Sequence, residues 1–281
     1  MSSAIPASSP LVRGIPSPKE AIALAYQGQP LLAGAGLFLL LATIPTLAAM
    51  GLDGRTLNGI DVWIKPLKFE VSLAVQLLSV AWLMLFLPER QGRLVRGLAI
   101  AMTAAAFFEI AYIALQASRG EASHYNVATP VAGLMYSLMG LGAVVLVATS
   151  GWIGALILRR GETSRPIVLA SGLGLVLGSV IGSLTGAYMS AQTGHWVGGE
   201  TTDAGGLPVF GWSRTGGDLR VAHFFGLHLI QILPVAAWAG AAILPSRLQK
   251  PAIIAVAAAG SLFALAVFVQ ALSGQPILGR G

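Results

Sequence analysis

Seven apolar runs, each long enough to cross a lipid bilayer as a helix, divide this chain. A spanning helix needs about 20 predominantly apolar residues, which is more than a core helix of a soluble domain requires. Only 10% of the residues are charged and the mean hydropathy is +0.77. The sequence therefore predicts an all-α integral membrane protein, a seven-transmembrane-helix bundle with spans at about 31–51, 67–88, 94–117, 131–158, 166–190, 220–244 and 251–272.

Lysine and arginine gather on one side of the predicted membrane. Ten of the 17 basic residues precede span one or follow spans two, four and six: Arg13, Lys19, Arg90, Arg93, Arg96, Arg159, Arg160, Arg165, Arg247 and Lys250. Short cytoplasmic loops carry such an excess. We therefore expect a cytoplasmic N-terminus and a C-terminus on the outer side.

This topology also explains the formal charge of +6 and the pI near 10.1, because basic loops lie beside anionic lipid. The lipid bilayer is thus the expected partner of these charges, and no nucleic acid is needed. The chain has no cysteine, which excludes disulfides, thiolate metal sites, cysteine nucleophiles and iron–sulfur clusters. A metal would need histidine, carboxylate or amide ligands.

Residues 1–30 are predicted to form a cytoplasmic tail. Residues 1–16 are rich in Ser, Pro and Ala, and we expect them to be disordered. Ser17 and Glu20 then form a capping-box pattern, with proline at the first helical position, so a short interfacial helix is expected to about Gln27.

Residues 31–281 are predicted to form the transmembrane domain, with one long outer loop at about 191–219. Loops of this length are typical of lids, binding loops or linkers. The loop is rich in glycine and carries His195, Trp196 and Trp212. We interpret it as a lid, and the alternative is that its tryptophans only anchor it at the membrane interface.

Span two has a polar face. At 100° per residue, five polar side chains fall within about 80° of arc, whereas Glu70 points elsewhere. The five are Lys65, Lys68, Ser72, Gln76 and Ser79. Such a stripe either lines a polar interior or consists of snorkelling lysines with Ser and Gln joining helices.

The outer half of span three has a similar stripe, followed by a polar loop. Glu109, Tyr112, Gln116 and Arg119 fit an arc of about 80°. The loop places His124 and Asn126 at the same end, before Thr129 caps span four. Ionisable residues within a span are functional candidates by default, and Glu109 is the deepest here.

Span six carries its polar residues on one face. Arg220, Phe224, His228 and Gln231 lie within about 80°, and His223 widens the arc to about 140°. Because the two histidines are five residues apart, they do not form the same-face metal pair of a helical motif. We expect Asp218 to cap this span and Pro234 to kink it.

Depth joins the three stripes into one predicted site. Glu109 and His228 each lie about 12 to 14 Å below the outer surface, and Gln76 is at a similar depth. The stripes therefore predict an outward-facing polar cavity between spans two, three and six, closed by the lid. Glu109 and His228 are the candidate acid/base pair; the cavity-lining candidates are Lys68, Gln76, Tyr112, Gln116, Arg119, His124, Asn126, Arg220, His223 and Gln231.

A metal held by His228, Glu109, His223 and His124 is a further possibility. A single-His haem also stays open, whereas a bis-His haem is disfavoured because the two helical histidines share one span. A retinal protein is disfavoured because residues 251–272 contain no lysine. The structural alternative is an ion-pair and hydrogen-bond network that only fixes helix packing.

Span five carries glycines at intervals of four, Gly174, Gly178, Gly182 and Gly186. Backbones can approach closely along such a seam. We interpret it as helix packing within the chain.

Three segments resemble signatures of uncharacterised bacterial integral membrane proteins: residues 63–69 (WIKPLKF), 119–126 (RGEASHYN) and 217–228 (GDLRVAHFFGLH). The resemblance implies a multi-pass protein of the bacterial inner membrane and carries no activity to any residue. Two functional classes are therefore expected: a membrane-embedded site that binds a metal, cofactor or small molecule, with or without acid/base chemistry, and a non-enzymatic carrier, receptor or accessory subunit that binds a small molecule or another membrane protein.

Overall fold

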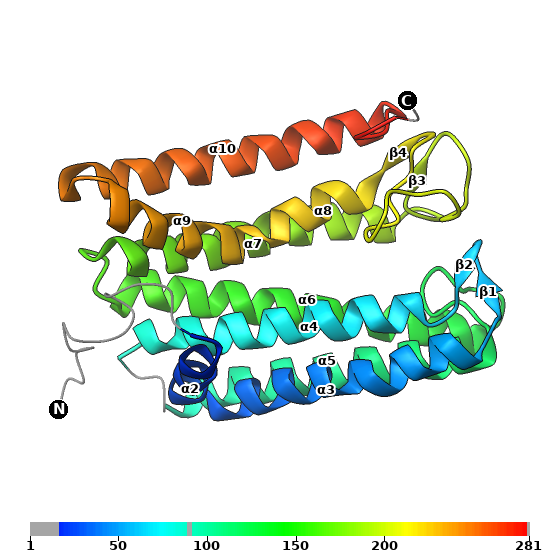
Figure 1. The fold of residues 1–281 in the computed structure, drawn as a ribbon, viewed down its shortest axis with the longest axis horizontal. Helices are drawn as coiled ribbons and strands as arrows, with labels where there is room; N and C mark the ends of the chain where they lie inside the picture. The colour runs from blue at the N-terminus through cyan, green and yellow to red at the C-terminus, as the bar shows by residue number, and fades with distance from the viewer. Residues whose placement is uncertain (1–16, 89–91, 280–281) are drawn as a thin grey trace.

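The computed structural model describes residues 17–88 and 92–279. The tail expected to be disordered, residues 1–16 with Arg13, lies outside the described residues, as do Arg90 and the last two residues. The described chain is nearly all helical, with its long helices running side by side (Figure 1).

The long helices have membrane-spanning length and composition. They are α3 (Pro30–Leu52), α4 (Ile64–Leu83) with the 3-10 turn η1 (Met84–Phe86), α5 (Arg93–Arg119), α6 (Pro130–Arg160), α7 (Pro166–Ser190) and α10 (Ser246–Leu272). Within the described residues, six helices are long and apolar enough to cross a membrane, or seven if the bent pair α8 (Leu219–Leu227) and α9 (Leu229–Ile243) forms one span. The chain is an all-α, multi-pass membrane bundle.

Helix α2 (Pro18–Gly28) begins with the predicted capping box. The Ser17 hydroxyl accepts from the Glu20 N–H, and the Glu20 carboxylate accepts from the Ser17 N–H at 2.8 Å. Figure 1 shows α2 crossing the other helices at one end of the bundle. A β-carbon at Gly28 would overlap the Ala81 carbonyl oxygen of α4, so glycine allows α2 to lie directly on α4.

Local chemistry also sets the starts of the long helices. Proline occupies the first turn of α3, α6 and α7, where no N–H donor is lost. The Thr129 hydroxyl accepts from Ala132 N–H at 3.1 Å, which confirms the predicted cap. Helix α4 begins at Ile64, earlier than expected from Pro66, so Lys65 belongs to the helix.

The helices form two groups joined through α6 and α7. In Figure 1, α3, α4 and α5 lie on one side, α8, α9 and α10 lie on the other, and α6 and α7 lie between them. The largest apolar cluster joins α3, α4, α5 and α6, and its most buried members include Leu32, Leu77, Met102 and Ile153. A smaller cluster around Leu233 joins α7, α9 and α10.

The expectation of a continuous span six with one kink at Pro234 is wrong. The helix breaks at His228, where α8 and α9 meet at 45°, and Pro234 lies inside α9 without ending it. At the break the His228 carbonyl accepts from the N–H groups of both Gln231 and Ile232, at 3.0 and 2.8 Å. The Gln231 bond therefore spans three residues instead of four, which tightens the turn and bends the axis.

The glycine seam of α7 packs against this broken helix, as predicted. A β-carbon at Gly174 would lie 2.6 Å from the Leu229 carbonyl oxygen, and one at Gly178 would lie 2.7 Å from Ile230 Cγ1 and 3.0 Å from the Leu227 carbonyl oxygen. Such distances are too short for a side chain. The seam thus lets α7 approach the backbone of α8 and α9 at the break.

Irregular segments gather at one end of the bundle, which we call the lid end. They are the hairpin of β1 (Thr56–Leu57) and β2 (Ile60–Asp61), the loop of residues 120–129, and the loop of residues 191–218, which we call the lid. The hairpin pairs Thr56 with Asp61, and its turn residues Asn58 and Gly59 have φ of 53° and 80°. Inside the lid, β3 (Trp196–Val197) pairs antiparallel with β4 (Gly217–Asp218).

The seam gives a stability prediction. Replacing Gly178 by leucine forces α7 away from α8 and α9, and overpacking of this kind costs about 1–3 kcal/mol or more. We expect Gly178→Leu to lower the melting temperature of the purified protein in detergent by several degrees, about 2–4 °C per kcal/mol for a chain of this size.

The matched control is Gly140→Leu in α6, because a β-carbon there meets nothing within 4 Å. Equal melting temperatures for the two variants would contradict the close approach of α7 to the broken helix.

Candidate functional site

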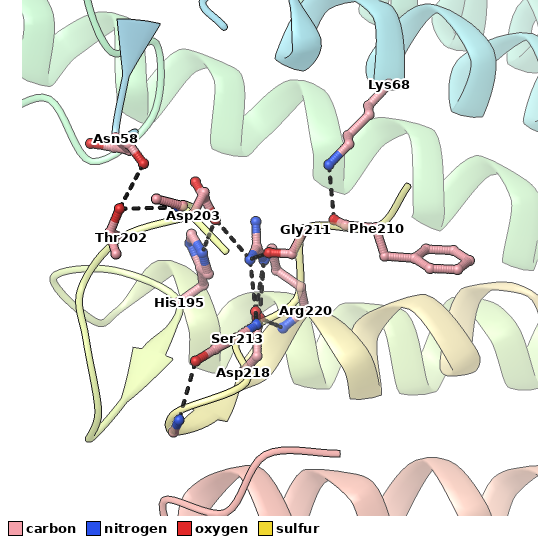
Figure 2. A network of polar contacts seen from close by, with 12 residues as sticks. Asn58, Lys68, His195, Thr202, Asp203, Phe210, Gly211, Ser213, Asp218 and Arg220 are labelled. Carbon is pink, nitrogen blue, oxygen red and sulfur yellow. Dashed lines mark hydrogen bonds and ion pairs between the residues drawn. The ribbon is translucent and has the colours of Figure 1, made fainter. Parts of the chain in front are cut away.

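The lid is a folded element that is docked on the bundle. The Leu219 N–H donates to the His195 carbonyl at 2.9 Å, at the junction of lid and α8. The tip of the β1–β2 hairpin holds the middle of the lid, because the Asn58 carbonyl accepts from Thr202 Oγ1 at 2.9 Å and from the Asp203 N–H at 3.0 Å (Figure 2). Three separate segments thus meet over the helix ends.

Arg220 of α8 is the centre of the polar network in Figure 2. Its Nη2 lies 2.9 Å from Asp203 Oδ1 and 2.7 Å from Asp218 Oδ2, and it donates to the Gly211 carbonyl at 2.7 Å. Asp218 also accepts from the Arg220 N–H, which confirms the predicted cap of this helix. One guanidinium therefore joins the middle of the lid and its C-terminal end to α8 through charge-assisted hydrogen bonds.

Aromatic packing and Lys68 fix the part of the lid nearest the helices. Phe210 stacks on Trp212 with ring centroids 4.4 Å apart, and both rings lie 5.3 Å from Phe224 of α8. Lys68 of α4 donates its Nζ proton to the Phe210 carbonyl at 2.8 Å. The lid thereby bridges α4 and α8.

Beneath the lid end, Lys65 of α4 meets His124 of the 120–129 loop. Lys65 Nζ lies 3.1 Å from His124 Nδ1, and Ser123 Oγ lies 3.2 Å from the same nitrogen. A charged lysine can only donate, so Nδ1 accepts and the remaining proton of the ring sits on Nε2. Burial, and then the Lys65 charge, hold the pKa of His124 well below its usual value, which keeps this histidine neutral.

Glu109 of α5 points its carboxylate into the bundle, toward Gly142 of α6. The residue is 2% exposed, and its Oε1 is buried without a hydrogen-bond partner. A β-carbon at Gly142 of α6 would lie 2.7 Å from Oε1, so the glycine makes room for the carboxylate. The charge of Lys65 acts on Glu109, so a buried acid lies within electrostatic reach of a half-buried base.

The described chain shows no hydrogen bond between Glu109 and His228, and a contact through water stays a prediction. The His228 ring packs on Phe224, with centroids 4.1 Å apart. His223 turns toward α7, where its Nδ1 lies 3.0 Å from the Gly182 carbonyl oxygen and 3.3 Å from Thr185 Oγ1. The two histidines of this broken span therefore have different surroundings.

The two glutamines of the predicted cavity join helices. Gln76 of α4 donates to Ser150 of α6 at 2.8 Å, and Gln231 of α9 donates to Ser79 of α4 at 3.1 Å. These contacts place the polar stripe of α4 toward the interior, in contact with α6 and α9. They also satisfy the amides with protein partners, as the structural alternative expects.

The remaining candidates mostly hold the 120–129 loop. The Gln116 side chain donates a hydrogen bond to Glu121 at 3.2 Å and accepts one from Arg119 at 3.5 Å. Asn126 donates to the Ala122 carbonyl at 3.1 Å. Tyr112 is half-buried in α5. This loop is thus tied to the end of α5, which positions His124 over Lys65.

The proposed metal ligands are not brought together. Across residues 17–88 and 92–279, no group of three or more His, Asp or Glu side chains could hold a metal ion. The set His228, Glu109, His223 and His124 is therefore corrected: His223 faces α7 and His124 is occupied by Lys65 and Ser123. Helical periodicity could predict neither the break at His228 nor the conformation of the 120–129 loop that carries His124.

Two features of this region were missed from the sequence. Asp203 lies in a loop, where no helical repeat predicts the neighbours of a residue, and no sequence pattern indicated its pairing with Arg220. Glu70 points away from the polar stripe, as predicted, but it is 4% exposed and accepts from Thr46 Oγ1 of α3 at 2.7 Å. A carboxylate within a span could have drawn attention to it.

Comparison of the chain with protein-family models, with curated proteins and with solved structures finds no match to any of them.

We expect His195 to make docking of the lid sensitive to pH. Burial lowers the pKa of His195 below its usual value, and this outweighs the hydrogen bond to Asp203 at 3.3 Å, which raises it. Burial also raises the pKa of Asp203, but the hydrogen bond from His195 and the charge of Arg220 hold it below its usual value. The docked lid thus keeps His195 neutral and Asp203 ionised.

A released lid would let His195 take a proton near its ordinary pKa of about 6.5. Docking stability is therefore fully present above about pH 6.5 and declines as the pH falls toward the lower pKa of the docked state. We expect the amides of residues 196–218 to lose hydrogen-exchange protection between about pH 7.5 and 5.5, after correction for intrinsic exchange.

The control is His195→Gln, which cannot titrate and should remove the pH dependence. Protection that stays constant or increases at lower pH in the native protein would contradict this account of the lid.

Proposed function

We propose that this protein binds a small polar molecule in a membrane-embedded site at the lid end, between α4, α5 and α8. Lys65 and Glu109 are its central residues, and the lid covers the approach to them. In this proposal Glu109 can act as an acid or base toward the bound molecule, while Lys68 and His124 complete the polar surroundings.

The unpartnered carboxylate oxygen of Glu109 is the observation that carries this proposal. Buried polar atoms in proteins nearly always have a partner, and exceptions call for a specific explanation. Glu109 is buried among helices, has room made for it by Gly142, and has Lys65 as its charged neighbour without an ion pair at contact distance in the described chain. A ligand with a donor group would satisfy the free oxygen.

The lid supports the same proposal. A structure that served only to join helices would not need a loop fastened by a half-buried Arg220, two aspartates and a buried histidine. Water exclusion by a closed lid strengthens electrostatic interactions within a site. His228 lies at the break between α8, which carries Arg220, and α9, and we retain it as a second candidate acid/base group.

For orientation, we propose seven spans in a bacterial inner membrane, with α8 and α9 forming one broken span, the N-terminus in the cytoplasm and the lid end on the outer side. The distribution of lysine and arginine supports this proposal. Reporters fused after Gly161 and Leu248 should be cytoplasmic, and a reporter after Gly205 in the lid should be outside. A cytoplasmic signal from the lid would overturn this orientation.

A second candidate function is that of an accessory subunit whose polar groups are structural. The contacts Gln76–Ser150 and Gln231–Ser79 favour it, because both amides already have partners between helices. In that case the binding partner is another membrane protein and the lid end is a docking face.

Lys65→Gln separates the two functions, because glutamine can still donate to His124 but has no charge. The small-molecule function predicts that protein purified in mild detergent retains a low-mass molecule, and that Lys65→Gln reduces this content by about tenfold, equivalent to 1.4 kcal/mol. Native mass spectrometry measures the content, and thermal stability should change little. Lys250→Gln, at the opposite end of the bundle, is the matched control.

The structural alternative predicts the reverse, because loss of one partner from a buried network typically costs about 3–5 kcal/mol. A Lys65→Gln protein that melts early, with no change in bound molecules, would therefore reject the proposed site.

A further inference from the structure

The charges under the lid suggest what kind of molecule the proposed site takes, an inference that rests on the proposed function. Three cationic side chains converge there: Lys65 and Lys68 of α4, and Arg220 of α8. Arg220 is paired with Asp203 and Asp218. In the described chain neither lysine has a carboxylate within 4.0 Å, since Lys65 donates to a neutral histidine and Lys68 to a backbone carbonyl.

The protonation state of Glu109 decides the net charge of the cluster that it forms with these three cations and two aspartates. The three cations and the two aspartates leave one net positive charge, which an ionised Glu109 cancels. A protonated Glu109 restores the positive charge. The three cations are half-buried and Glu109 is buried, and an uncompensated charge is costly where the surroundings exclude water. Loss of the charge on Glu109 therefore favours the entry of a negative charge from outside.

We propose that the lid-end site binds a small monovalent anion together with one proton, the anion between Lys65 and Lys68 and the proton on Glu109. The bound state then carries the same net charge as the empty state. Because each event compensates the other, anion binding favours protonation of Glu109, and protonation of Glu109 favours anion binding to the same extent.

The positions of the two lysines and of Glu109 provide a site for the anion and a site for the proton. Lys65 and Lys68 are three residues apart on α4, so their side chains leave one face of the helix as neighbours. Lys68 now donates to the Phe210 carbonyl of the lid, a neutral acceptor that an anion would replace when the lid lifts. Glu109 has a free oxygen to hold a proton and, through it, to donate to the anion.

The groups that face Glu109 make it the proton acceptor. Gly142 of α6 lies against its carboxylate, the charge of Lys65 of α4 acts on it, and Tyr112 lies one turn away on its own helix. His124, on the neighbouring loop, already uses Nδ1 as an acceptor for Lys65 and Ser123. A proton on that nitrogen would break the contact with Lys65 and put two positive charges side by side, so the proton goes to the carboxylate.

The test measures nitrate binding by calorimetry, and proton uptake with an indicator dye, for the full chain in detergent at several pH values from about 6 to 8. Nitrate does not titrate there, so any proton taken up belongs to the protein. Uptake of one proton per nitrate weakens binding by about tenfold for each pH unit above the titration of Glu109.

Glu109→Gln imitates the protonated carboxyl, and we expect it to bind nitrate with a dissociation constant that does not change with pH and without proton uptake. Lys68→Gln should weaken binding by about tenfold or more, since it removes one of the two cations. Lys250→Gln is the charge-matched control and should keep both the pH profile and the uptake.

Two outcomes would overturn the inference. Nitrate binding that depends on Lys68, but takes up no proton and has the same pH profile in Glu109→Gln, would show an anion site without proton coupling. Absence of Lys68-dependent nitrate binding, while the protein still retains a low-mass molecule through Lys65, would show that the ligand is not an anion of this kind. In both cases the proposed function stands; it fails only if Lys65→Gln leaves the bound molecules unchanged.

Discussion

Charge balance in a region shielded from water is the constraint on which the lid end depends. Arg220 can lie at the junction of lid and bundle because Asp203 and Asp218 both contact its guanidinium. A buried charge without such partners costs several kcal/mol. Arg220 and the two carboxylates hold the lid on α8, and the Asn58 carbonyl of the β1–β2 hairpin holds the middle of the lid. The lid in turn contacts Lys68.

The same constraint separates the structural groups from the candidate functional ones. Arg220, Asp203, Asp218, Gln76 and Gln231 have direct partners, and their contacts explain how the helices and the lid stay together. Glu109 lacks a partner on one oxygen, and the two lysines lack contacting acids in the described residues. The candidate functional groups are therefore the charged side chains that form no ion pair with one another, Glu109 and the two lysines.

Periodicity predicted much of this arrangement, and its failures have physical causes. The stripe of α4 was found because Lys65, Lys68, Gln76 and Ser79 recur on one face of a regular helix. Lys65, Gln76 and Ser79 make part-buried contacts with other segments, and Lys68 contacts the lid at a more exposed position. The seam of α7 was found in the same way. The prediction for span six assumed one continuous helix. It failed because the chain breaks at His228, so His223 and His228 do not share one helical face. Asp203 could not be found, since loops have no period and its role depends on a contact far along the chain.

The most direct test of the account is whether Glu109 takes a proton when an anion enters. Infrared difference spectroscopy detects the C=O stretch of a protonated carboxylic acid separately from the bands of a carboxylate. On addition of nitrate to the native protein at neutral pH, the account predicts a new carboxylic-acid band that is absent from Glu109→Gln. A spectrum without that band in the native protein, or with the same band in Glu109→Gln, would contradict it.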